Sequence, residues 1–173
     1  MKASLRPYQK SDWPALLALW IEAWTHTRSD IDFAARAPWL ADLLAKSEQD
    51  GAEIVVAEDG TGLAGFVLFD ADRQWLEQIA VHPRAQGDGV ARRLVRRVKA
   101  ACPERVDLTV NMDNKRALAF YHSEGFVRQG KSVNALSGLP IYLLRWEREQ
   151  FSGETPDAKA AGFREPPAPQ PPC

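Results

Sequence analysis

The pattern of apolar and polar residues divides this chain into short strand-like runs and longer helical stripes. Between residues 53 and 81, three apolar runs separated by turn residues predict a β-hairpin that continues into a third antiparallel strand. Further strands are expected at 3–8, 105–110, 126–129 and 140–146. The first of these contains Arg6-Pro7, which indicates an edge strand because proline cannot donate a hydrogen bond to a ladder.

Four other stretches follow the spacing of helices. Ser11 or Asp12 can cap the first helix, which is followed by a polar connection at 25–32. The second helix is expected at 33–47 with an interruption at Pro38 and Trp39, and the fourth runs over about 114–123. The third begins at Val90 and presents one apolar stripe, made of Val90, Ala91, Leu94, Val95 and Val98, opposite a basic face.

These elements follow one another in the order β-α-α-β-β-β-α-β-α-β-β, which predicts a mixed sheet with helices on its faces. The strand at 105–110 follows the strand at 75–81 through a helix. If that helix is a right-handed crossover, the two strands must be parallel.

A glycine-rich turn lies between the strand at 75–81 and the third helix. Its residues are Gln86, Gly87, Asp88, Gly89, Val90 and Ala91. Strand, turn and helix in this order build an anion site from the backbone, because first-turn N–H groups have no partner within the helix and the helix dipole attracts negative charge. The expected guest is a phosphate group.

Two common nucleotide motifs fit this turn poorly. A Walker loop ends in Gly-Lys-Ser/Thr, whereas Val90 follows the last glycine here. A dinucleotide fingerprint needs three glycines early in a βαβ unit and an acidic residue about twenty positions later. Only two glycines occur in this turn, and they lie late in the chain.

The turn resembles the acyl-CoA-binding turn of the GNAT superfamily of N-acetyltransferases. The matching residues are Gln86-x-x-Gly89-x-Ala91, five residues after Val81. Arg84-x-x-Gly87-x-Gly89 also satisfies the pattern, but the Gln86 register places Gly89 at the start of the helix. A second block, Asn114-x-x-Ala117-x-x-Phe120-Tyr121-x-x-x-Gly125-Phe126, resembles a later segment of the same family.

The resemblance covers roughly residues 3–147 and implies the acyl-CoA N-acyltransferase fold. That fold is α/β, with a central mixed, mostly antiparallel seven-stranded sheet, splayed fourth and fifth strands, and helices on both faces. We expect an N-acetyltransferase domain at 1–150 and a proline-rich tail at 151–173. The residues that the resemblance assigns to acetyl-CoA are Ile79, Ala80, Val81, Gln86, Gly87, Asp88, Gly89, Val90, Ala91 and Asn114.

Two residues are candidates for proton transfer. Glu77 could accept a proton from the amine, directly or through a water, and strand alternation would put it on the face of Val81, four residues later. Tyr121 could return a proton to the leaving thiolate. Other interpretations stay open: Glu77 as a solvated carboxylate, Tyr121 as aromatic packing, and Asn114 as a helix cap.

The resemblance implies an acyltransferase that moves an acetyl group from acetyl-CoA to a primary amine of a small molecule or peptide, by direct attack in a ternary complex. The alternative is a non-catalytic CoA-binding regulatory module. The resemblance to this family also allows a homodimer that forms through the C-terminal strands.

Composition adds limits to this interpretation. The chain has 173 residues, a formal net charge of -1 and a pI of about 6.3, which suit a single domain without a nucleic-acid or membrane partner. Its N-terminus lacks the apolar core of a signal peptide, so we expect a cytoplasmic protein. Cys102 and Cys173 are the only cysteines, so neither a disulfide framework nor a metal site is expected.

Overall fold

The computed structural model describes residues 3–135 and 137–148, which form two compact units. One unit ends at Leu108 and the other begins at Thr109. The proline-rich segment 151–173 lies outside the described residues, so its separation from the preceding domain stays a prediction.

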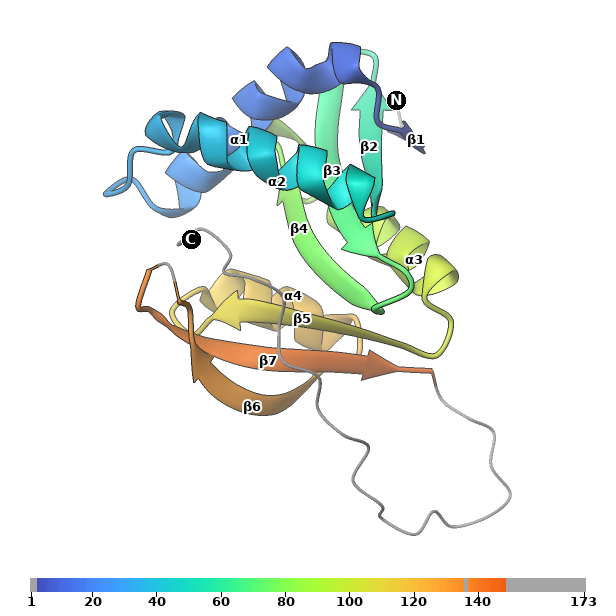
Figure 1. The fold of residues 1–173 in the computed structure, drawn as a ribbon, viewed down its shortest axis with the longest axis vertical. Helices are drawn as coiled ribbons and strands as arrows, with labels where there is room; N and C mark the ends of the chain where they lie inside the picture. The colour runs from blue at the N-terminus through green and yellow to red at the C-terminus, as the bar shows by residue number, and fades with distance from the viewer. Residues whose placement is uncertain (1–2, 136, 149–173) are drawn as a thin grey trace, which may run out of the picture. The chain divides into compact units, whose positions relative to one another are not determined.

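Helices and strands alternate in the predicted order (Figure 1). The elements are β1 (Ser4–Pro7), η1 (Lys10–Asp12), α1 (Trp13–Thr27), η2 (Ala34–Arg36), α2 (Ala37–Gln49), β2 (Glu53–Asp59), β3 (Gly62–Asp70), β4 (Trp75–Val81), η3 (Pro83–Ala85), α3 (Val90–Ala101), β5 (Arg105–Asn111), α4 (Lys115–Ser123), β6 (Val127–Val133) and β7 (Pro140–Glu147), where η marks a single 3-10 turn.

The strands form one hydrogen-bonded order, β1-β2-β3-β4-β5-β7-β6. Strands β1 to β4 pair antiparallel in sequence, and so do β6 and β7. Strand β4 pairs with β5 in parallel, at Trp75 and Asp107. The mixed, mostly antiparallel seven-stranded sheet and the parallel crossover are therefore confirmed, while the splay of β4 and β5 beyond this pair stays a prediction.

Helices cover both faces of β2, β3 and β4 in the first unit (Figure 1). Phe66 and Leu68 point to one face, where they join a buried cluster with α1 and α2 residues such as Trp20 and Leu40. The alternate residues of β3 point to the other face, which α3 covers with its predicted apolar stripe. Val90, Leu94, Val95 and Val98 of that stripe are buried.

Gly65 lets α3 approach β3 closely. A Cβ atom at this position would lie 2.9 Å from the carbonyl oxygen of Ala80 and 3.0 Å from Cγ1 of Val90. Both distances are too short for ordinary contact, and the first involves backbone that cannot rotate away. A residue without a side chain therefore positions the start of α3 against the end of β4.

Three sequence-based expectations about element boundaries were wrong. Pro38 does not interrupt the second helix but lies in the first turn of α2, where its missing N–H would have had no partner in the helix. Helix α1 extends to Thr27, into the expected polar connection. Strand β6 continues to Val133 because it pairs along its length with β7, a long-range contact that residues 126–129 do not reveal.

In the second unit, α4 precedes the antiparallel β6–β7 hairpin. Strand β6 ends the strand order, and its Val127 and Val133 are 63% and 61% exposed. No helix within the described ranges combines the length and the apolarity that crossing a bilayer requires.

Candidate active site

The turn between β4 and α3 has the geometry of an anion site. Gly87 and Gly89 adopt positive φ angles of 95° and 77°, which favour glycine because a Cβ atom would strain the backbone. Gly89 is the N-cap of α3, and its carbonyl accepts the N–H of Arg93 at 3.1 Å. The N–H groups of the first turn thus have no acceptor within the helix. They form an electropositive end, to which the helix dipole contributes.

Two side chains hold this turn to the strands. Arg84 donates to Oδ2 of Asp59 at 2.7 Å and to the carbonyl oxygen of Leu63 at 3.0 Å, so it is engaged by the β2–β3 hairpin. The Arg84 guanidinium holds the pKa of Asp59 well below its usual range. Gln86 donates through Nε2 to the carbonyl oxygen of Val81 at 3.5 Å. The Gln86 register of the motif agrees with this arrangement, because Arg84 is committed elsewhere and Gly89 starts the helix.

The two glycines leave free space beside the turn. A Cβ atom built on Gly87 or Gly89 would meet nothing within 4 Å, so the backbone is open to a ligand on that side. The N–H of Asp88 is used within the turn, donating to the Ala85 carbonyl at 3.4 Å. The other predicted binding residues of this unit surround the same turn: Ile79, Ala80 and Val81 end β4, and Val90 and Ala91 begin α3.

Glu77 lies at an irregularity in β4. The ladder with β3 pairs Leu68 with Gln78 but Phe69 with Leu76, so Glu77 is the extra residue of a β-bulge. Bulges redirect side chains and are common beside active sites.

The bulge corrects the expected face of Glu77. Val81 lies opposite Gly65, on the face that α3 covers. Trp75 lies opposite Asp70, on the other face, and its Nε1 donates to Oε2 of Glu77 at 2.8 Å. Glu77 therefore shares the α1/α2 face with Trp75, opposite to Val81. The prediction from regular strand alternation failed because the extra residue of the bulge changes which face the following side chains occupy.

The environment of Glu77 favours its protonated form. The side chain is partly buried, and burial raises its pKa from 4.5 to about 7, against the opposing effects of the Trp75 hydrogen bond and the positive charge of Arg73. A carboxyl group with this pKa can accept a proton near neutral pH.

Sequence analysis overlooked two further residues, one beside Glu77 and one directly after the end of β4. Gln78 is only 3% exposed, and its one sequence signal is an uncharged polar residue beside Glu77 in a strand whose other residues are apolar. His82 follows the strand, and its Nε2 lies 3.1 Å from Oε2 of Glu22 on α1. Because Nδ1 of His82 accepts the N–H of Arg84 at 3.2 Å, the ring proton is on Nε2, and the histidine links α1 to the turn.

Asn114 and Tyr121 belong to the second unit. Asn114 caps α4 by accepting the N–H of Ala117 at 3.0 Å, so its interpretation as a helix cap is confirmed. Tyr121 is buried, and its ring packs against Phe120 and Phe126 with centroid distances of 5.3 Å. The expected contacts of both residues with acetyl-CoA, and the approach of Tyr121 to the site of Glu77, stay predictions.

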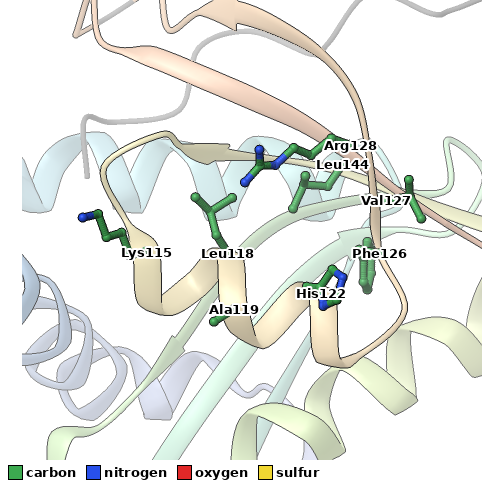
Figure 2. A pocket seen from close by; sticks show the side chains of 8 residues that line it. All are labelled: Lys115, Leu118, Ala119, His122, Phe126, Val127, Arg128 and Leu144. Carbon is green, nitrogen blue, oxygen red and sulfur yellow. The ribbon is translucent and has the colours of Figure 1, made fainter.

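The second unit also contains a groove that sequence analysis did not find (Figure 2). It lies along α4 beside β6 and β7, and it combines three basic side chains with an apolar floor. The residues that line it are Lys115, Leu118, Ala119, His122, Phe126, Val127, Arg128 and Leu144.

Comparisons with known proteins agree with this geometry. The model of the acetyltransferase (GNAT) family matches residues 13–126, a range that includes Glu77, the glycine-rich turn and Tyr121. The peptidyl-lysine N-acetyltransferase YiaC of Escherichia coli (strain K12) is 29% identical over 145 residues, which are 82% of this chain and 95% of that protein.

Solved structures share the fold. The solution structure of the apo form of YjaB from Escherichia coli has a TM-score of 0.68 and 28% identity, covering 84% of this chain and 97% of its own. A phosphinothricin acetyltransferase from Sinorhizobium meliloti, solved in complex with AcCoA, has a TM-score of 0.65. It covers 91% of this chain and 94% of its own, and at 18% identity it supports the fold alone.

Proposed function

This chain belongs to the acetyltransferase (GNAT) family and is an acyltransferase; from that premise we propose that it transfers the acetyl group of acetyl-CoA to a primary amine, with a lysine side chain of a peptide as the acceptor. The single observation that carries the proposal is the partly buried Glu77, whose pKa of about 7 suits a general base. The peptide acceptor is suggested by the relative YiaC, a peptidyl-lysine N-acetyltransferase. We also propose that the reaction takes place in the cytoplasm.

Acetyl-CoA, when bound, supplies an activated acyl group on a thioester. The backbone between Gln86 and Ala91 would hold its diphosphate through the first-turn N–H groups of α3, which are preorganised by the positive φ angles of the two glycines. The end of β4 at Ile79–Val81 would hold the pantetheine arm, and Asn114 would contribute from α4. These residues bind and orient the thioester.

Glu77 would remove the proton from the incoming ammonium group. A lysine amine has a pKa near 10.4 and arrives charged, so it cannot attack until it loses a proton. The new N–C bond forms as the C–S bond breaks, and the reacting nitrogen gives its second proton to solvent water as the amide forms. Tyr121 would donate a proton to the departing sulfur, whose thiol has a pKa near 8.5.

The proposal is tested by thiol release from acetyl-CoA in the presence of a lysine-containing peptide. Glu77→Gln keeps the shape of the side chain and removes the base, so kcat is expected to fall about 10²- to 10⁴-fold. The dissociation constant for CoA, measured by calorimetry, should change less than twofold because Glu77 lies outside the turn. Glu104→Gln, which makes the same chemical change at an exposed position, is the matched control.

Other results would redirect the assignment. Full turnover by Glu77→Gln would show that Glu77 is not the general base. Thiol release with small amines but not with peptides would show that the acceptor is a small molecule rather than a peptide lysine. Tight CoA binding without thiol release across a broad amine panel would favour the non-catalytic CoA-binding module.

A further inference from the structure

We propose that His82 positions the glycine-rich turn for CoA, because one ring nitrogen fixes the backbone that enters the turn and the other ties it to α1. This inference rests on the diphosphate-binding role proposed above for residues 86–91. It adds a positioning residue that lies outside the turn.

The first link fixes the backbone between β4 and the turn. His82 is the N-cap of η3, and its Nδ1 accepts the N–H of Arg84 at 3.2 Å. A side chain that accepts the N–H two residues later reproduces an Asx turn, which Asn and Asp usually form. The carbonyl oxygen of His82 also accepts the N–H of Ala85 at 2.8 Å. These bonds set the direction in which the chain leaves β4 and enters the turn.

The second link joins the same residue to a helix that is distant in the sequence. Nε2 of His82 lies 3.1 Å from Oε2 of Glu22, in the middle of α1. Since Nδ1 acts as an acceptor, Nε2 carries the ring proton and donates it to this carboxylate. The imidazole therefore uses both nitrogens at once, one toward the turn and one toward α1.

The type of residue at this position indicates that both links matter. Asparagine would supply the acceptor of an Asx turn, but its shorter amide does not extend as far as Nε2 of the ring. An imidazole has two polar atoms that point in different directions, so it can bond to two elements. Histidine thus does what the usual residue of this turn cannot do.

This attachment complements those already described. Arg84 ties the entry to the turn to the β2–β3 hairpin, and the apolar stripe of α3 holds the other end of the turn against the sheet. His82 adds a tie to α1, on the opposite face of the sheet from α3. A binding site that is held in its bound conformation before the ligand arrives loses less entropy on binding. The link to α1 should therefore raise the affinity for CoA.

The test is a double-mutant cycle that measures the dissociation constant for free CoA by calorimetry, at a temperature where every variant is folded. His82→Asn keeps the Asx-turn acceptor and loses the bond to α1, and Glu22→Ala removes the same bond from the other side. Each change should raise the dissociation constant about threefold, the scale of an exposed pair. The double variant should raise it no further, because both changes remove one bond. His82→Ala loses both links and should raise it about tenfold.

Three further variants serve as controls. His122→Asn on α4 and Glu48→Ala on α2 make the same chemical changes at exposed positions, and both should leave the dissociation constant unchanged. Gly87→Asp places a carboxylate on the turn itself, where it would repel a diphosphate. This variant should raise the dissociation constant at least about tenfold.

The cycle separates positioning from stability. Unchanged affinity in His82→Asn and Glu22→Ala overturns the inference even if their melting temperatures fall, because the contact then stabilises the fold alone. Additive effects of the two changes overturn it as well, since they would not act through one bond. Full affinity in Gly87→Asp would show that the diphosphate binds elsewhere, and the proposed role of the turn would fall together with this inference. Weak binding by Gly87→Asp with full affinity in the other variants overturns this inference alone.

Discussion

Glu77→Gln should stabilise the protein at high pH and not at low pH. The folded state raises the pKa of Glu77 from 4.5 to about 7, so the folded protein binds this proton more tightly than the unfolded chain does. The favourable contribution of the protonated group is complete below pH 4.5 and is lost as the pH rises through 7. Above pH 7 the buried carboxylate is a net cost to the fold, which the neutral amide of glutamine avoids.

The size of the effect follows from the same pKa difference. At about 1.4 kcal/mol per pH unit, the ionised carboxylate costs up to about 3 kcal/mol of unfolding free energy at pH 9. For a chain of this length, that corresponds to a rise of roughly 6–12 °C in the melting temperature of Glu77→Gln relative to the wild type. At pH 4.5 the two proteins should differ little, because both side chains are then mainly neutral.

The assay is urea unfolding of wild type and variant at several pH values between 4.5 and 9, with Glu104→Gln as the exposed control. The difference in unfolding free energy should grow between pH 5 and pH 8 for Glu77→Gln and stay flat for the control. A flat difference for Glu77→Gln, or a variant that is less stable at pH 9, would refute the claim that burial dominates this site. The argument for Glu77 as a base near neutral pH would lose its physical support.

Two further predictions concern Trp75 and Gly65. Trp75→Phe removes the N–H that favours ionised Glu77, so the pKa of Glu77 should rise. The midpoint of the rise of kcat/KM with pH should then move up by about one pH unit, and an unchanged midpoint would contradict the role of this hydrogen bond. Gly65→Ala should lower the unfolding free energy by about 1–3 kcal/mol because its Cβ would press on the Ala80 carbonyl and on Val90. Gly130→Ala, where nothing lies within 4 Å of the added Cβ, is the matched control in the same urea experiment, and equal losses in both variants would show that crowding is not the cause.

The glycine-rich turn was predictable because it depends on neighbours in the sequence. Gly89 starts α3 with a positive φ angle, as its position before an amphipathic stripe suggested. The buried residues of α3 were also predicted, since the burial of Leu94 and Val98 follows from helical spacing alone.

The environment of Glu77 could not be predicted from the neighbouring sequence. The sequence suggested a carboxylate in the strand, four residues before Val81, and Glu77 does lie within β4. The predicted face of the sheet was wrong, because the bulge arises from pairing with β3 and has no local signature in the sequence. Its raised pKa also depends on burial, which residues distant in the sequence create.

The order of elements, the glycine-rich turn, the helix cap at Asn114 and the family resemblance were all set by the sequence itself. These features depend on hydrogen bonds and backbone angles within a few residues, so a linear pattern contains them. Tertiary structure alone decided which face of the sheet Glu77 occupies, that burial raises the pKa of Glu77 to about 7, and that Gly65 admits α3 against β4. The reason is physical: strand register and desolvation depend on residues that are distant in the sequence and become neighbours only when the chain folds.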